Sequence, residues 1–101
     1  MRDDATKRVY EEALKRWGID AQLNVAIEEC AELTAEICRY FRDRCSLTGI
    51  ACEVADVEIM IEQLRLIVGE TAVNEIKERK LMRLAERLRD GDQGDPDERS
   101  T

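Results

Sequence analysis

Acidic side chains at helical spacing are the residues of this chain that can do chemistry. Glu29 and Glu32 stand three residues apart, and Glu53 and Asp56 repeat that spacing. Steps of three and four residues place side chains on one face of a helix. Like charges gathered in a partly buried place raise one another's pKa and destabilise the fold unless a cation lies among them. We therefore expect these four carboxylates to bind a divalent metal.

The other residues of the chain narrow the choice of metal. The sequence contains no His, and its cysteines form no C-x-x-C pair. A set of carboxylate oxygens favours Mg²⁺, with Mn²⁺ also acceptable, over Zn²⁺. The alternative is a solvated acidic face without a metal, which a chain with 23 acidic residues can produce by chance. Cysteines 30, 38, 45 and 52 are expected to be reduced thiols that fill the core.

Helices must position the carboxylates, and the apolar pattern predicts four of them, at about residues 5–16, 20–44, 50–69 and 70–89. Asp20 is the expected N-cap of the second helix. Ser46, Thr48 and Gly49 interrupt the pattern and offer caps for the third, which leaves its start open. Short connections make neighbouring helices antiparallel, so the expected fold is an all-α four-helix bundle.

The acidic residues of the second and third helices flank apolar seams. The predicted seam of the second helix is Leu23, Ala26, Cys30, Leu33 and Ile37, and that of the third is Val54, Val57, Ile61 and Leu64. At 100° per residue, the acidic stripe is displaced from the seam by about a third of a turn. Packing along these seams would bring the four carboxylates together at the edge of the core.

Length and composition indicate one domain, residues 1–90, followed by an acidic tail, residues 91–101. Charged residues make up 39% of the 101 residues and there is one proline, which favours long helices. The net charge of −7 gives no basic footprint for nucleic acid, and no apolar run approaches the roughly 20 residues of a membrane span. Because the first residues also lack the pattern of a signal peptide, we expect a soluble, cytoplasmic protein.

The core of such a chain is expected to be thin. Many of its apolar residues are small, and it has four aromatic residues. Uncovered apolar faces predict a homodimer or a homotetramer. Tyr40 and Phe41 are expected to pack in the core, and a core anchor is one interpretation of Trp17.

Two stretches resemble a known family. W-G-I-D-A-Q-L-N-V-A-I-E-E-C-A-E-L, and after a gap E-V-A-D-V-E-I-M-I-E-Q-L, are similar to the MazG-like all-α nucleoside triphosphate pyrophosphohydrolases. In that family, E-E-x-x-E on one helix and E-x-x-D on the next hold Mg²⁺. The matching residues here are Glu28, Glu29 and Glu32, then Glu53 and Asp56. The resemblance covers residues 17–68, and residues 70–90 more loosely.

The resemblance implies Mg²⁺-dependent cleavage of a nucleoside triphosphate, ribo or deoxy, to monophosphate and pyrophosphate. Glu29 or Glu32 would orient the attacking water or accept its proton, as a general base does. The rival hypotheses are a non-enzymatic helical oligomer that serves as a scaffold and a metal-binding regulator that keeps the fold. Release of pyrophosphate separates the enzyme from both.

Candidate substrate-binding residues lie outside the carboxylate motifs. From residue 77 to 89 six basic residues face two acidic ones, and Lys77 and Lys80 are the expected phosphate contacts. A solvated, ion-paired helix face is the alternative. Asn74 can contact the sugar or a phosphate, or cap the start of its helix. Gln22 and Trp17 precede the acidic stripe and can contact a nucleobase by hydrogen bonding and stacking.

Overall fold

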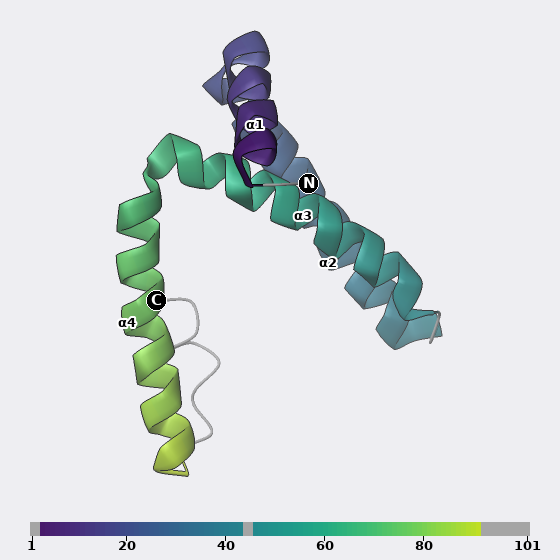
Figure 1. Cartoon of the computed structure of the whole chain (residues 1–101). Helices are drawn as coiled ribbons and strands as arrows, with labels where there is room; N and C mark the ends of the chain where they lie inside the picture. The colour runs from purple at the N-terminus through teal and green to yellow at the C-terminus, as the bar shows by residue number, and fades with distance from the viewer. Residues whose placement is uncertain (1–2, 44–45, 92–101) are drawn as a thin grey trace. The chain divides into compact units, whose positions relative to one another are not determined.

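The computed structural model describes residues 3–43 and 46–91, and all of the regular structure in these ranges is α-helical (Figure 1). The helices are α1 (Asp3–Trp17), α2 (Ile19–Asp43), α3 (Leu47–Val68) and α4 (Glu70–Arg89). The prediction of an all-α fold is therefore confirmed. Within the described ranges, none of the helices combines the length and the hydrophobicity needed to cross a membrane.

The chain divides into two compact units. The first comprises residues 1–68 with helices α1, α2 and α3, and the second comprises residues 69–101 with α4. The predicted acidic tail lies, from residue 92 onward, outside the described residues.

Single glycines separate the helices at two of the three junctions. Gly18 has φ 87° and Gly69 has φ 105°, values that L-residues with a side chain rarely adopt. The N–H of Gly18 donates to the carbonyl of Leu14 at 2.9 Å, and its own carbonyl accepts from the N–H of Gln22 at 3.2 Å. One residue thus ends α1 and starts α2. The prediction that Asp20 is the N-cap is wrong, because α2 already begins at Ile19 and Asp20 lies in its first turn.

The start of α3 depends on Ser46. Its Oγ accepts a hydrogen bond from the N–H of Thr48 at 2.9 Å, which satisfies one of the donors left unpaired at a helix start. Gly49 does not break the helix but lies within its first turn, facing Glu36 of α2.

Helices α2 and α3 run antiparallel and pack side by side (Figure 1). The residues of α2 that are shielded from solvent follow a heptad-like spacing, and so do those of α3. On α2 they include Gln22, Ala26, Glu29, Leu33, Glu36 and Tyr40, and on α3 they include Ile50, Glu53, Val57, Met60 and Leu64. The glutamates therefore lie in the line of contact between the helices, not at its edge.

The predicted seams are only partly right: residues 26, 33, 57 and 64 are shielded from solvent, but the other five are exposed. Leu23 and Ile37 remain 39% and 37% exposed, and Cys30 is also exposed. On α3, Val54 and Ile61 are 40% and 44% exposed. The apolar faces exist, but the facing helix meets a stripe displaced by about one residue.

The core of the first unit is small. Among the described residues, only Ala26, Met60, Gln22 and Gln63 are buried. These four lie near the end of the α2–α3 pair where α1 also packs against both helices. The packing roles predicted for Trp17 and Phe41 are wrong in this chain, since they are 61% and 66% exposed. The cysteines at 30, 38 and 52 are free and exposed rather than core fillers, and Cys45 lies outside the described residues.

Candidate metal centre

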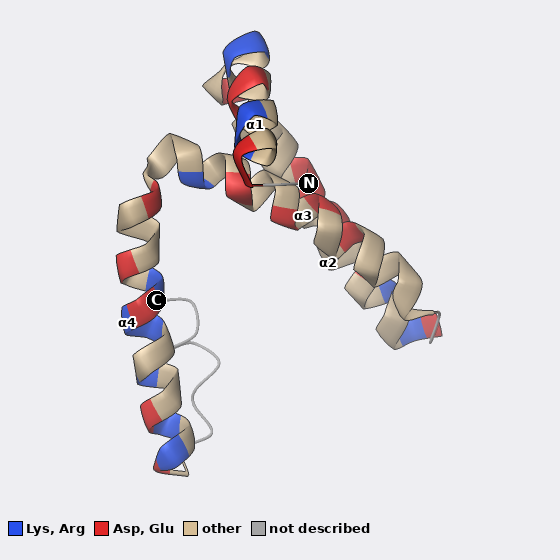
Figure 2. Ribbon diagram, in the orientation of Figure 1, with Lys and Arg blue, Asp and Glu red and all other residues tan. Residues whose placement is uncertain are grey.

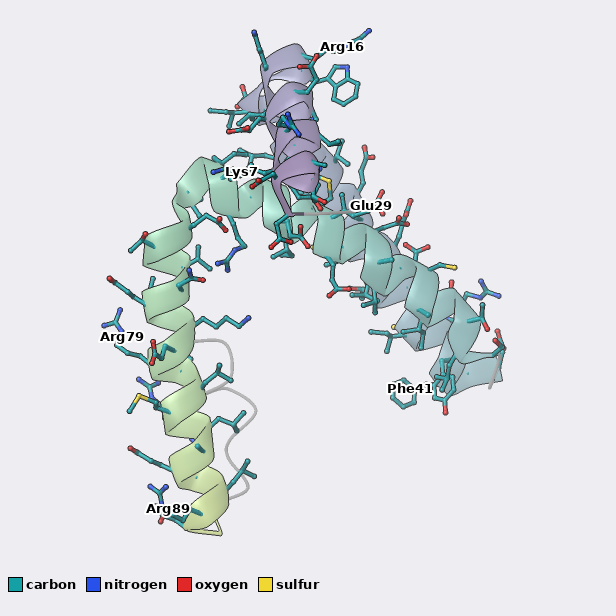
Figure 3. All side chains as sticks on the ribbon, in the orientation of Figure 1. Lys7, Arg16, Glu29, Phe41, Arg79 and Arg89 are labelled. Atoms are coloured by element: carbon teal, nitrogen blue, oxygen red, sulfur yellow. The ribbon has the colours of Figure 1, made fainter. Side chains whose placement is uncertain are left out.

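Three carboxylates from two helices meet between α2 and α3. Glu29 of α2 and Glu53 and Asp56 of α3 each place a carboxylate oxygen within 4.8 Å of the others. We call these three residues the carboxylate cluster. Acidic residues gather along the α2–α3 pair in Figure 2, and Glu29 is labelled on it in Figure 3. The antiparallel packing of α2 and α3 produces this convergence, because each E-x-x-E or E-x-x-D pair spans one helical turn.

Two oxygens of the carboxylate cluster are buried without a partner. Oε2 of Glu29 and Oε2 of Glu53 have almost no exposed surface, and neither accepts a hydrogen bond from any described residue. A buried acceptor that is left unpaired costs about 1–3 kcal/mol, and more when it is charged. Each of these oxygens is therefore suited to accept a bond from a cation.

The electrostatics of the carboxylate cluster favour protonation in the absence of a cation. Desolvation raises the pKa of Glu29 above 4.5, and the negative charges of Glu32, Asp56, Glu53 and Glu28 raise it further. Desolvation is also the largest cause of the raised pKa of Glu53, followed by the charges of Glu32, Asp56 and Glu36. These residues are only partly buried, so solvent screens part of the repulsion. A divalent ion would reverse both effects.

Glu32, the fourth predicted ligand, acts on the carboxylate cluster through its charge. After desolvation, the negative charge of Glu32 is the largest cause of the raised pKa of both Glu29 and Glu53. Glu32 itself is exposed. The structure thus brings three of the four motif carboxylates together, while Glu32 acts on them through its charge from an exposed position.

Two further glutamates border the site. Glu28 is exposed and acts on Glu29 from one flank. Glu36, one turn beyond Glu32, accepts a hydrogen bond and an ion pair from Arg39 at 3.3 Å. Its carboxylate lies against Gly49, so Glu36 is already engaged and is less suited to bind a metal than Glu29 or Glu53.

The donor set fits a hard divalent cation. Carboxylate oxygens are the ligands that Mg²⁺ and Mn²⁺ accept, and Mg²⁺ commonly keeps several waters and meets substrate phosphates. Glu29, Glu53 and Asp56 can hold such an ion directly, and Glu32 can complete the shell from the solvent side. The two orphaned oxygens are the observation in favour of this fit.

A cavity of about 390 Å³ lies beside α1, about one helical turn from the carboxylate cluster. Its lining comprises Ala13, Trp17, Ala21, Gln22, Val25, Met60 and Gln63. Trp17 is at the end of α1, where Gly18 turns the chain, and its ring lies 6.0 Å from the Arg16 guanidinium. Gln22 is 4% exposed. The two residues predicted to contact a nucleobase therefore line one cavity.

Sequence reasoning missed two residues of this cavity, Met60 and Gln63. Met60 follows Asp56 by one turn, and Gln63 follows Met60 by three residues, so both lie on the side of α3 that carries the motif. A signal was present, because Gln63 is a polar residue at core-facing spacing between Met60 and Leu64.

The predicted phosphate contacts lie on α4. Lys77, Lys80 and Asn74 are exposed residues of this helix, whose second half is rich in basic side chains (Figure 2). Asn74 is not the helix cap, because Gly69 occupies the N-cap position and Asn74 lies in the second turn. Since α4 belongs to the second unit, its contribution to the site stays a prediction.

The chain matches no protein-family model, no curated protein and no solved structure. The likeness to MazG-like enzymes therefore rests on the residues of the two carboxylate motifs.

Proposed function

We propose that this protein is a Mg²⁺-dependent nucleoside triphosphate pyrophosphohydrolase of the MazG-like type. The observation that carries the proposal is the pair of orphaned, buried oxygens of Glu29 and Glu53, which lie on adjacent helices and converge with Asp56. A solvated acidic face does not need to bury its carboxylates against one another. A site built for a cation does.

In the proposed reaction, water attacks the α-phosphorus of the substrate. The bond between this phosphorus and the oxygen that bridges to the β-phosphorus breaks, and pyrophosphate leaves together with the monophosphate. Bound Mg²⁺ supplies charge neutralisation on the phosphates and a water of lowered pKa. No nucleophilic side chain is required.

Glu29 and Glu32 are the proposed catalytic residues. A general base must lie within hydrogen-bond reach of the water and have a pKa near the working pH. Glu29 is part of the carboxylate cluster and Glu32 is exposed beside it, so a water at the site would lie within reach of either carboxylate. One of them orients the water and accepts its proton, while Glu53 and Asp56 hold the metal.

The remaining residues have proposed roles in binding the substrate. Trp17 and Gln22 hold the base in the cavity beside α1. Lys77 and Lys80, with Asn74, contact the phosphates or the sugar from α4. We also propose the MazG-type bundle and a homodimer or homotetramer, because the exposed faces of α2 and α3 need a cover.

The test is a panel of ribo, deoxy and oxidised nucleoside triphosphates with millimolar Mg²⁺, assayed for pyrophosphate. We expect turnover of at least one substrate, and loss of turnover with chelator. Glu53→Gln should abolish the reaction. Lys80→Ala should weaken it less, since one charge-assisted hydrogen bond contributes roughly 1.5–3 kcal/mol.

Two results would count against the proposal. Orthophosphate as the first product would indicate attack at the terminal phosphorus. No turnover of any nucleotide, together with intact Mg²⁺ binding, would favour a metal-binding regulator.

A further inference from the structure

The cavity beside α1 is lined by uncharged side chains, although it lies close to the carboxylate cluster. Its lining has four apolar residues, one tryptophan and the amides of Gln22 and Gln63. Its volume of about 390 Å³ falls within the range of small-molecule sites. Such a lining favours a neutral part of a ligand. The phosphates of the proposed substrate would instead bind Mg²⁺ and the lysines.

Gln63, a residue of the cavity wall, has a hydrogen-bonding atom without a partner among the described residues. Its side chain is 8% exposed, and Nε2 donates to the thioether sulfur of Met60 at 3.5 Å. Oε1 is buried and has no partner among the described residues. Since buried polar atoms in folded proteins are nearly always paired, this acceptor is suited to an N–H donor that a ligand supplies.

The cavity also offers surfaces that fit a flat ring. Trp17 is 61% exposed at its rim, and tryptophan presents a face on which an aromatic ring stacks. Met60 is buried in its wall, and thioether sulfur makes favourable contacts with aromatic rings. A neutral heteroaromatic ring with an N–H on its edge satisfies all three features.

The position of Gln63 relative to the carboxylate cluster fits a nucleotide. Gln63 follows Asp56 by seven residues on α3, which is about 10 Å along a helix axis. That separation leaves room for a sugar between a ring in the cavity and phosphates at the carboxylates.

We propose that Gln63 is a specificity-determining residue that accepts a hydrogen bond from an N–H donor of an uncharged nucleobase held against Trp17. This inference rests on the proposed function, whose substrate class it sharpens. It predicts selection for bases whose edge carries a free N–H. A base that has lost this hydrogen to methylation would leave Oε1 unpaired and add a methyl group in its place.

The experiment measures nucleoside binding without phosphates and without metal. Trp17 is the only tryptophan of the chain, so its fluorescence reports on binding next to this residue, and the Gln63 variant tests whether that binding is in the cavity. The full chain, in chelator, is titrated with thymidine and N3-methylthymidine, and with cytidine and N4,N4-dimethylcytidine. The variants are Gln63→Met, which removes the acceptor, and Glu58→Met, an exposed position on the same helix, as the matched control.

We expect at least one unmethylated nucleoside to bind wild type and Glu58→Met about tenfold more tightly than its methylated counterpart. Gln63→Met should lose that difference while it still binds the methylated nucleoside as wild type does, which shows that the cavity is intact. Equal affinity of wild type for both members of each pair would overturn the inference. A Gln63→Met variant that keeps the tenfold difference, or the absence of any nucleoside binding, would also overturn it.

These outcomes are separable from failure of the proposed function. Nucleoside selection in chelator without pyrophosphate release from any triphosphate would refute the catalytic proposal and leave the role of Gln63 standing. Pyrophosphate release without nucleoside selection would do the reverse.

Discussion

The carboxylate of Glu36 on α2 lies directly against Gly49 on α3. A Cβ atom placed on Gly49 would stand 2.9 Å from Cδ of Glu36, and closer still to Oε1. The absence of a side chain at position 49 thus allows this glutamate to fold inward, next to Glu53, whose pKa it helps to raise.

Gly49→Ala tests how firmly Glu36 is held. Alanine in a helix is favoured over glycine by about 1 kcal/mol, and the atoms that it meets are the far end of a flexible side chain. We expect Glu36 to swing outward and the variant to be more stable by roughly 0.5–1 kcal/mol. Urea unfolding measures the change. The control is Gly49→Ala combined with Glu36→Ala. If Gly49→Ala destabilises the protein only when Glu36 is present, then Glu36 cannot move away.

Removal of a metal ligand should separate binding from folding. Glu53→Gln and Asp56→Asn each remove a charge and little volume, so helical content should stay near that of wild type while Mg²⁺ binding is lost. Stability without metal should rise, because Glu53 is repelled by Glu32, Asp56 and Glu36. Circular dichroism and titration calorimetry test this, with Glu58→Gln, an exposed carboxylate of α3, as the control. Unchanged Mg²⁺ affinity in both variants would remove them from the site.

The metal-free protein should become more stable as the pH falls from neutral. Glu29 and Glu53 have pKa values raised above 4.5 in the folded chain, so the folded state binds protons more tightly than the unfolded one. The resulting stabilisation is full below the unfolded pKa and is lost as the pH rises through the raised values. Denaturation in chelator across this pH range should show it. Glu53→Gln should weaken the trend, and an identical pH profile in that variant would contradict the assignment.

Tyr10 should titrate far above ordinary tyrosines. Its burial and a hydrogen bond to Glu62 of α3 raise its pKa to about 12. The stability that this contact gives is complete below pH 10, the unfolded pKa, and is lost as the pH rises through about 12. Ultraviolet titration of wild type and Tyr10→Phe should identify one late phenol, and Glu62→Gln should lower its pKa. A normal pKa for Tyr10 would mean that α1 is not joined to α3 in this way.

Assembly should depend on the apolar faces of α2 and α3. Light scattering at micromolar concentration should give a dimer or a tetramer, whereas Ile61→Glu, at an exposed position on α3, should shift the mass toward the monomer. Truncation after Asp90 should lower the mass of each subunit and leave the number of subunits unchanged. A monomer at this concentration in wild type would contradict the prediction.

The sequence was sufficient to predict the helices but not the way in which two of them meet. Periodicity located an apolar face on α2 that includes Leu23 and Ile37, and hydrophobicity alone suggested that α3 would cover it. In the structure α3 covers Ala26 and Leu33 of that face, but Glu29 and Glu36 lie in the contact where Cys30 and Ile37 were expected. Burial of carboxylates is unfavourable without a cation, so no scale of hydrophobicity predicts it.

The convergence of the carboxylates was more predictable than the cavity beside them. The spacing of Glu29, Glu32, Glu53 and Asp56 required only that consecutive helices pack antiparallel. The cavity required more, because its rim depends on the exact end of α1, and a helix end is set by local hydrogen bonds that sequence patterns locate only to within a few residues. Gln63 gave a weak signal because glutamine is also common on helix surfaces.

The left-handed backbone of Gly18 means that substitution of this residue can alter the cavity without any contact to it. An L-residue at this position would disfavour φ 87° and favour one uninterrupted helix through α1 and α2, which would carry Trp17 away from Gln63. Nothing lies within 4 Å of a Cβ built there, so crowding plays no part and only the torsion matters. Selection for ligand binding would therefore act on a residue that touches no ligand. A D-alanine, whose preferred torsions are the mirror image, would preserve a turn that most natural substitutions at position 18 would disturb.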